Sequence, residues 1–238
     1  MVGLSNGILE AVNLILSFDP ELYGIIKLTL IVTISSTLVS AMIAVPLGVL
    51  VGSCNFKGRK ILIRITNTLM GLPPVVAGLI VYIILSRTGP LGFTQLLFTP
   101  KAMVIAQVII VTPIIAGFTL SAVKLKVKPV FETCQGLGLT KAKSIKLLIY
   151  ECRYPIISAI MAGYGRAISE VGAIMLVGGN IQYFTRVMTT AIMLETSQGN
   201  YGKALALGIV LLSISFFINW IINNLQEGMS YESRSIKS

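Results

Sequence analysis

Long apolar segments alternate with short polar ones along this chain of 238 residues. A helix needs roughly 20 apolar residues to cross the hydrocarbon core of a membrane, and the apolar segments are long enough. We therefore predict an all-α polytopic membrane protein with five transmembrane helices. The expected spans cover about residues 24–52, 61–85, 102–123, 156–178 and 202–225.

Polar residues mark the segments outside these spans. Residues 1–22 mix apolar with acidic and amide side chains, which is typical of a short helix in the membrane interface. Because the first basic residue is Lys27, we expect no signal peptide at this end. The longest polar stretch is 124–155, and a polar tail covers 226–238. The transmembrane domain is therefore expected over 23–225.

The composition agrees with a membrane protein. Hydrophobic residues make up 55% of the chain and charged residues 12%, against about 25% charged in soluble proteins. The net charge of +10 fits basic cytoplasmic loops better than a nucleic-acid surface. The chain has no histidine, which excludes imidazole zinc sites and Ser-His-Asp catalysis within it. Cys54, Cys134 and Cys152 lack metal-ligand spacing, and we expect them to stay reduced.

The distribution of basic residues predicts the orientation, because cytoplasmic loops carry an excess of Lys and Arg. The first of the two sides of the membrane holds Lys57, Arg59, Lys60, Arg64, Lys124, Lys126, Lys128, Lys141, Lys143, Lys146, Arg153, Arg234 and Lys237. The second holds Lys27, Arg87, Lys101, Arg186 and Lys203. We therefore expect the N-terminus outside, the C-terminus in the cytoplasm, and the long polar stretch between the third and fourth spans in the cytoplasm.

Prolines interrupt the second expected span. Pro73 and Pro74 remove two backbone donors, which a membrane helix tolerates only where neighbours or a cavity satisfy the freed carbonyls. Two interpretations remain open: a hinge or broken helix beside a pathway, and a static kink. Pro46 and Pro113 lie inside the first and third spans, and we expect Pro46 to kink its helix.

Two charges lie within the fourth expected span. Arg166 falls about 15 Å from the cytoplasmic end of the span, where a charge costs roughly 2.5–3.5 kcal/mol. Glu170 follows four residues later, so we expect both side chains on one helix face. This face either lines or gates an anion pathway, or holds a structural ion pair that locks helices of two subunits together.

The long polar stretch is expected to form a compact helical knob. Pro129 suits the first turn of a helix, and Glu132 in that turn would complement the helix dipole. Gly136 or Gly138 can end this helix in the left-handed conformation. Thr140 can then cap a second, lysine-rich helix. An ordinary cytoplasmic helix hairpin is the alternative interpretation.

Several segments resemble import permeases of the ATP-binding cassette (ABC) class. Residues 132–138 (ETCQGLG) resemble the loop by which such permeases bind their ATPase, with Thr133-Cys134 where Ala-Ala is common and Tyr150-Glu151 where Leu-Pro is common. Similarity to the molybdate, tungstate and sulfate permeases lies in residues 71–78 (GLPPVVAG), 89–92 (GPLG) and 166–173 (RAISEVGA). The segments most similar to the tungstate branch are residues 178–180 (GGN) and 185–192 (TRVMTTAI).

The resemblance implies the permease fold and the function of a membrane subunit in an ATP-driven oxyanion importer, with tungstate as the first choice of substrate and molybdate or sulfate as alternatives. It implies that the ATPase is coupled through Glu132, Thr133, Cys134, Gly138 and Thr140. The substrate pathway or gate would include Arg166, Ser169, Glu170, Thr189 and Thr190.

The resemblance also implies the partners and the location. These are a second copy of the chain, two cytoplasmic ATPase subunits, an extracytoplasmic oxyanion-binding protein and membrane lipid, in a prokaryotic cell membrane. No Gly-x4-Gly-Lys-Ser/Thr motif occurs, so we expect ATP and Mg on the separate ATPase, and no cofactor, metal or catalytic residue here. Loops around Arg87, Lys101, Arg186 and Glu195 are expected to bind the binding protein.

Two other classes of function remain as alternatives. An ion-coupled secondary transporter would normally show internal repeats and titratable groups at the midplane, and the chain shows no such repeat. A membrane scaffold without transport would explain the spans but not the glycine-bounded knob. Co-purification with an ATPase separates the ABC permease from both.

Overall fold

The computed structural model describes residues 20–235, which form helices joined by turns. Contacts divide this part of the chain into two compact units, residues 30–185 and residues 20–29 with 186–235. The interfacial helix expected over 1–22 lies almost wholly outside the described residues. Each unit is described by itself.

Two continuous helices match expected spans but run further. α2 covers Pro20–Ser53 and contains Pro46 in its interior. α5 covers Pro100–Gly136 and extends well past the expected end at residue 123. It continues because the segment after residue 123 is rich in lysine, a good helix former, and α5 accommodates Pro129 within its length.

Two other expected spans are broken rather than continuous. The second consists of α3 (Arg59–Met70) and α4 (Pro74–Leu85), which are bent by 101°. Pro73 precedes α4 in an extended conformation and Pro74 begins it, so the prolines cause this break, while a hinge beside a pathway stays a prediction. The fourth consists of α7 (Arg153–Ile168) and α8 (Gly172–Gly178), bent by 59° without any proline at the break.

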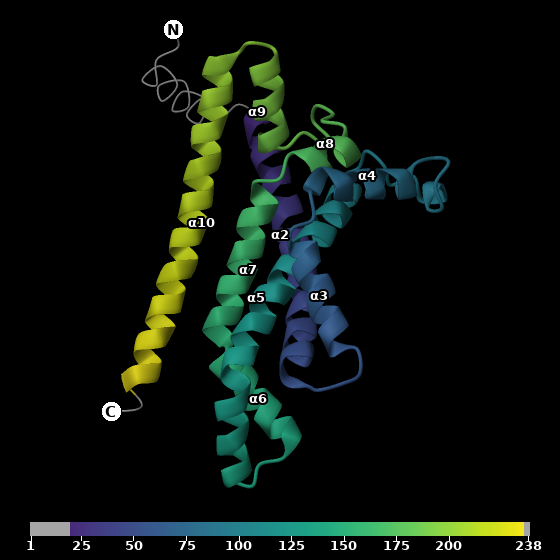
Figure 1. The fold of residues 1–238 in the computed structure, drawn as a ribbon. Coiled ribbons are helices and arrows are strands. Elements are labelled where there is room, and N and C mark those ends of the chain that lie inside the picture. The colour runs from purple at the N-terminus through teal and green to yellow at the C-terminus, as the bar shows by residue number, and fades with distance from the viewer. Residues whose placement is uncertain (1–19, 236–238) are drawn as a thin grey trace. The chain divides into compact units, whose positions relative to one another are not determined.

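Glycines allow close helix contacts in the 30–185 unit. A Cβ on Gly48 or Gly52 of α2 would lie 2.8 Å from Thr119 Cβ or 2.6 Å from Val123 Cγ1 of α5. This four-residue spacing of small residues permits close approach of membrane helices. α5 also packs along α7, where a Cβ on Gly163 would lie 2.6 Å from an atom of Ile115. Figure 1 shows α5 and α7 side by side, with α6 (Lys141–Glu151) folded back beside α5.

The other unit is built on a helical hairpin. α9 (Met188–Ser197) and α10 (Tyr201–Ser235) run antiparallel in Figure 1. α9 lies where the sequence predicted only a loop, and α10 continues beyond the expected end at residue 225. The core of this unit joins the start of α2 to both helices through Leu22, Ile25, Met188, Ala191, Ala206, Leu207 and Val210.

Within residues 20–235, the helices long and apolar enough to cross a membrane lie in α2, α5 and residues 201–221 of α10. If each bent pair counts as one span, the total rises to five. The described part of the chain is therefore all-helical with three to five candidate spans. A short 3-10 helix, η1 (Gly92–Thr94), lies in the loop between α4 and α5.

Candidate functional site

The two charges expected within the fourth span lie at the break between α7 and α8. Arg166 lies in the last turn of α7, and Glu170 lies beyond its end in the break. Arg166 Nη2 is 3.5 Å from Glu170 Oε2, so the two side chains pair. The two residues do not share a helix as expected, because α7 ends at Ile168 and Glu170 lies in the break, but their side chains still meet at the i,i+4 spacing. The Arg166 side chain is 36% exposed and that of Glu170 only 4%, so only the cation is accessible.

Side chains satisfy the backbone groups that the break releases. Ser169 Oγ donates to the carbonyl of Arg166 at 3.1 Å. On the other side of the break, the N–H of Ala173 in α8 donates to Glu170 Oε1 at 3.1 Å. Such compensation is needed because unpaired backbone groups are costly in an apolar medium. Ser169 is itself exposed at the surface of the chain.

Gln107 is a residue of this site that sequence reasoning missed. It lies on α5, is 1% exposed, and its Nε2 donates to the carbonyl of Ala167 at 2.9 Å. Its Oε1 accepts a hydrogen bond of 2.6 Å from Ser36 Oγ of α2. A signal existed: Gln107 is a lone amide within the apolar segment 102–111, and such residues in membrane helices commonly bond to another helix.

The second helix of each bent pair, α4 and α8, contacts the other. A Cβ on Gly172, the first residue of α8, would lie 2.7 Å from Val75 Cγ2 near the start of α4. A Cβ on Gly78 of α4 would lie 2.5 Å from the Cα of Ala173. The starts of α4 and α8 are therefore in direct contact, and both breaks lie in the same region of the 30–185 unit.

The predicted pathway residues divide between the two units. Arg166, Ser169 and Glu170 lie together at the α7–α8 break, whereas Thr189 and Thr190 belong to α9 of the other unit. The hydroxyl of Thr190 accepts a hydrogen bond from the Val187 N–H at 3.1 Å and donates to the Val187 carbonyl at 3.0 Å. Thr190 therefore closes the first turn of α9, and Thr189 is buried beside it.

The predicted ATPase-coupling residues lie at the tip of the α5–α6 hairpin. Gly138 has a φ of +66°, as expected for a glycine that ends a helix. Its N–H donates to the Gln135 carbonyl at 3.0 Å, and the Leu139 N–H donates to the Cys134 carbonyl at 2.9 Å. Thr140 occupies the N-cap position of α6, although its side chain makes no capping hydrogen bond.

Glu132 is placed differently from the sequence expectation. The prediction that it lies in the first turn of a helix begun by Pro129 is wrong, because α5 continues to Gly136 and Glu132 lies near its end. Its carboxylate is 3.9 Å from Lys128 Nζ, one turn earlier, and both side chains are largely exposed. An exposed pair of this kind contributes about 0.3–0.5 kcal/mol, which leaves Glu132 available to a partner.

Exposure divides the tip of the hairpin into two faces. Cys134 is fully buried, so within this chain it packs the hairpin from inside. The exposed positions include Glu132, Thr133, Leu137, Gly138 and Thr140. At the other end of α6, Lys126 Nζ donates to the Glu151 carbonyl at 2.6 Å and so fixes α5 to α6. The exposed tip of the hairpin therefore carries both polar and apolar side chains, and the Lys126–Glu151 hydrogen bond holds its two helices together at the opposite end.

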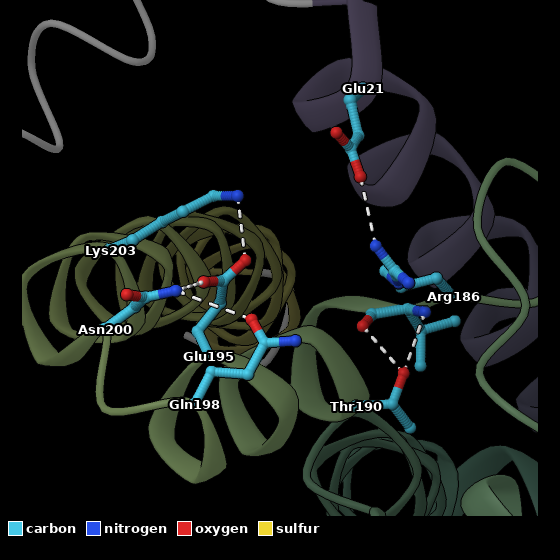
Figure 2. A network of polar contacts seen from close by, with 8 residues as sticks. Glu21, Arg186, Thr190, Glu195, Gln198, Asn200 and Lys203 are labelled. Atoms are coloured by element: carbon cyan, nitrogen blue, oxygen red, sulfur yellow. Dashed lines mark hydrogen bonds and ion pairs between the residues drawn. The ribbon is translucent and has the colours of Figure 1, made fainter.

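Two ion pairs organise the 20–29 and 186–235 unit (Figure 2). Glu21 Oε1 accepts a hydrogen bond from Arg186 Nη1 at 3.1 Å, and Glu195 Oε1 lies 2.7 Å from Lys203 Nζ. Asn200 Nδ2 donates to Glu195 Oε2 at 3.0 Å. Burial raises the pKa of Glu195, but these hydrogen bonds and the charges of Lys203 and Arg186 outweigh it, so the pKa is below its usual value.

The loops around Arg87, Lys101, Arg186 and Glu195 were expected to bind the binding protein, and these four residues differ in how exposed they are. Arg186 and Glu195 have side chains only 16% and 10% exposed and are engaged with Glu21 and Lys203. Arg87 and Lys101, in the other unit, are exposed.

Residues 44–231 match the family described as the binding-protein-dependent transport system inner membrane component, and the chain belongs to this family. It is 44% identical to the tungstate uptake system permease protein TupB of Peptoclostridium acidaminophilum, over 94% of this chain and 98% of that protein. It is 37% identical to TupB of Campylobacter jejuni, over 93% and 92% of the two chains. A probable anion ABC transporter permease of Haloferax volcanii is 39% identical, over 83% and 88%.

Family membership fixes the general function. The protein is a multi-pass permease of the prokaryotic inner membrane and part of a binding-protein-dependent ABC transport system. Its partners include an ATPase and a substrate-binding protein. Such membrane subunits are not catalytic and carry no cofactor. The expectations of an ABC permease, of a transport subunit rather than an enzyme, and of this membrane location are thereby confirmed.

Proposed function

We propose that the protein is the permease of a tungstate uptake system. The observation that carries this proposal is the similarity to two permeases named for tungstate, at 44% and 37% identity over more than nine-tenths of the chain. Molybdate and sulfate remain the alternative oxyanions, because the segment RAISEVGA at 166–173 resembles permeases of all three. An ion-coupled secondary transporter is not favoured, because the family works with an ATPase.

The proposed topology has five spans, with the N-terminus outside and the C-terminus in the cytoplasm. Two spans are the bent pairs α3–α4 and α7–α8, and the others are α2, α5 and the first part of α10. In this orientation the α5–α6 hairpin lies in the cytoplasm with its lysines, as the positive-inside rule requires. The α9 helix and its connections then lie on the outer side.

The proposed anion path runs along the α7–α8 break. Arg166 offers a partly exposed cation there, while the nearly buried Glu170 holds it in place. An intramembrane charge usually faces a polar interior, and the broken backbone is acceptable where it lines a cavity. Because Glu170 neutralises Arg166, an oxyanion is attracted without being held tightly, which suits transport. The competing proposal is a purely structural ion pair.

The α5–α6 hairpin is proposed to bind the ATPase. Glu132, Thr133, Gly138 and Thr140 are exposed at its tip, whereas Cys134 would act by packing the hairpin. The left-handed Gly138 sets the direction in which the chain leaves α5. A rigid protruding tip is what transmits movement between a soluble motor and membrane helices.

Each of two ATPase subunits would need one hairpin to bind, and this chain supplies one hairpin and one α7–α8 break. We therefore propose a homodimer surrounded by membrane lipid. Mass measurement of the complex purified in detergent tests the stoichiometry. Two copies of this chain per pair of ATPase subunits are expected, and one copy would contradict the proposal.

The substrate is tested in cells that lack their own tungstate uptake. The permease is produced with its ATPase and binding protein, and intracellular tungsten is measured by mass spectrometry at low external tungstate. Accumulation is expected to resist an excess of sulfate and to disappear when the ATPase is inactivated. Accumulation of sulfate or molybdate without tungsten would instead assign the system to those anions.

A further inference from the structure

The amide of Gln107 connects three helices of the 30–185 unit at the α7–α8 break. Its oxygen accepts from Ser36 Oγ of α2, and its nitrogen donates to the carbonyl of Ala167 in α7. A carbonyl can only accept, which fixes the nitrogen on that side. Gln107 is 1% exposed, so water does not compete for these bonds.

The Ala167 carbonyl has a special place in the backbone. In a continuous α-helix it would accept from the N–H of residue 171, four positions later. α7 ends at Ile168, and Val171 precedes α8 outside any helix, so that bond is absent. The Glu170 N–H donates to the same carbonyl at 3.2 Å, and Gln107 supplies a second, shorter hydrogen bond at 2.9 Å. The Gln107 amide thus adds a second donor to a carbonyl that lacks its usual helical partner.

The opposite side of the break is satisfied by Glu170, which accepts from the Ala173 N–H. Glu170 and Ser169 belong to the break itself, whereas Gln107 comes from another helix, 60 residues away from Ala167. No proline enforces the break. Without Gln107, the Ala167 carbonyl keeps only the 3.2 Å bond from the Glu170 N–H, and winding residues 168–172 into a helix would give it back the usual helical donor, the Val171 N–H.

We propose that Gln107 is a positioning residue that keeps the α7–α8 span broken and thereby holds the Arg166–Glu170 pair at the break. This inference rests on the proposed anion path along the break for its role in transport. Its structural part stands independently of the substrate: the bend between α7 and α8 depends on the Gln107 amide.

The bend is measured with spin labels on Ser158→Cys in α7 and Leu176→Cys in α8, in the complete complex. Cys54 is replaced by serine, since Cys134 and Cys152 are buried. Gln107→Met keeps the length of the side chain and removes both hydrogen bonds. The distance between the labels is expected to become longer and its distribution broader, while tungstate transported per ATP falls.

Two serines of α2 provide the matched controls. Ser36→Ala removes the bond that orients the amide and is expected to broaden the distance distribution in the same direction. Ser40→Ala removes a buried hydroxyl one turn further along, which has no hydrogen-bond partner among the described residues, and should change nothing.

An unchanged distance distribution in Gln107→Met overturns the proposal, even if the variant is less stable, because a packing role alone would lower stability without straightening the span. If Gln107→Met does not assemble, Ser36→Ala decides: a distribution identical to that of Ser40→Ala overturns the proposal. If the wild-type complex fails to transport tungstate but the distance shifts, the proposed substrate is wrong and the role of Gln107 stands.

Discussion

The guanidinium of Arg166, in the last turn of α7, pairs with the carboxylate of Glu170 in the break that follows, with 3.5 Å between Nη2 and Oε2. The acid is almost fully buried while the arginine remains partly exposed. Removing the arginine would therefore leave a buried carboxylate without its counter-charge, whereas removing the acid would free an accessible cation. The two substitutions are expected to differ in their effects on transport.

We predict that Arg166→Ala and Glu170→Ala each lower the stability of the complex, and that the double variant loses less than the sum of both. Breaking a buried pair by removing one partner typically costs about 3–5 kcal/mol, and the exposure of Arg166 should bring the cost toward the lower end. Thermal unfolding of the purified variants gives the coupling between the two residues.

Transport distinguishes the two roles of this pair. If Arg166 guides the anion, the folded double variant should hydrolyse ATP but take up tungstate slowly. Uptake that recovers together with stability would support a structural pair instead. An Arg166→Ala protein with full stability and full uptake would contradict both.

Gly138→Val is predicted to uncouple ATP hydrolysis from transport. A left-handed conformation costs a non-glycine residue about 1–2 kcal/mol, and valine would move the backbone at the tip of the hairpin out of this region. Gly136→Val is the matched control, since Gly136 also has open space around its Cβ position but no positive φ. ATPase activity and uptake are measured on the same preparations, and equal coupling in both variants would refute the role of Gly138.

Gly78→Ala is predicted to disturb the contact between α4 and α8. Its Cβ would lie 2.5 Å from the Cα of Ala173, a backbone atom that cannot move alone. Overpacking of this kind costs about 1–3 kcal/mol and should displace α8. In Gly165→Ala, a helical glycine with open space, the change should be neutral or stabilising by roughly 0.5–1 kcal/mol. The apparent melting temperatures of the two variants provide the comparison, and equal values would contradict the close contact between α4 and α8.

The Glu195–Lys203 pair is predicted to stabilise its unit in a pH-dependent way. The pKa of Glu195 is lowered by its partners, so its contribution is present above the unfolded value of about 4.3 and is lost as the pH falls through the lower folded value. Wild type should therefore have a higher melting temperature than Glu195→Gln at neutral pH, and the difference should disappear as the pH falls through the lowered pKa of Glu195 in the folded state. Glu151→Gln, which alters a more exposed pair, should show a smaller difference at neutral pH.

Much of the fold could be predicted from local sequence. The apolar lengths located α2 and most of α10, and Pro73-Pro74 located the break between α3 and α4. These features depend on residues close together in the chain. The left-handed Gly138 was predictable for the same reason.

The missed features depend on contacts between distant residues. No residue between Ile168 and Gly172 is a proline, and the α7–α8 break is supported instead by Gln107 on α5 and by the packing of Gly172 against Val75. α9 was missed because its sequence is short and its stability comes from burial against α2 and α10. Helix propensity alone does not specify such elements.

The proposed anion path crosses the membrane beside the α7–α8 break, and the accessibility of Ser169 tests it most directly. Ser169→Cys is made in the Cys54→Ser background and treated with a charged, membrane-impermeant thiol reagent, with Leu212→Cys on the exposed apolar part of α10 as the lipid-facing control. Labelling of Ser169→Cys that depends on the ATPase cycle and is slowed by tungstate, with no labelling of Leu212→Cys, is the result predicted. Labelling of Ser169→Cys only by lipid-soluble reagents, in every state of the cycle, would contradict this path.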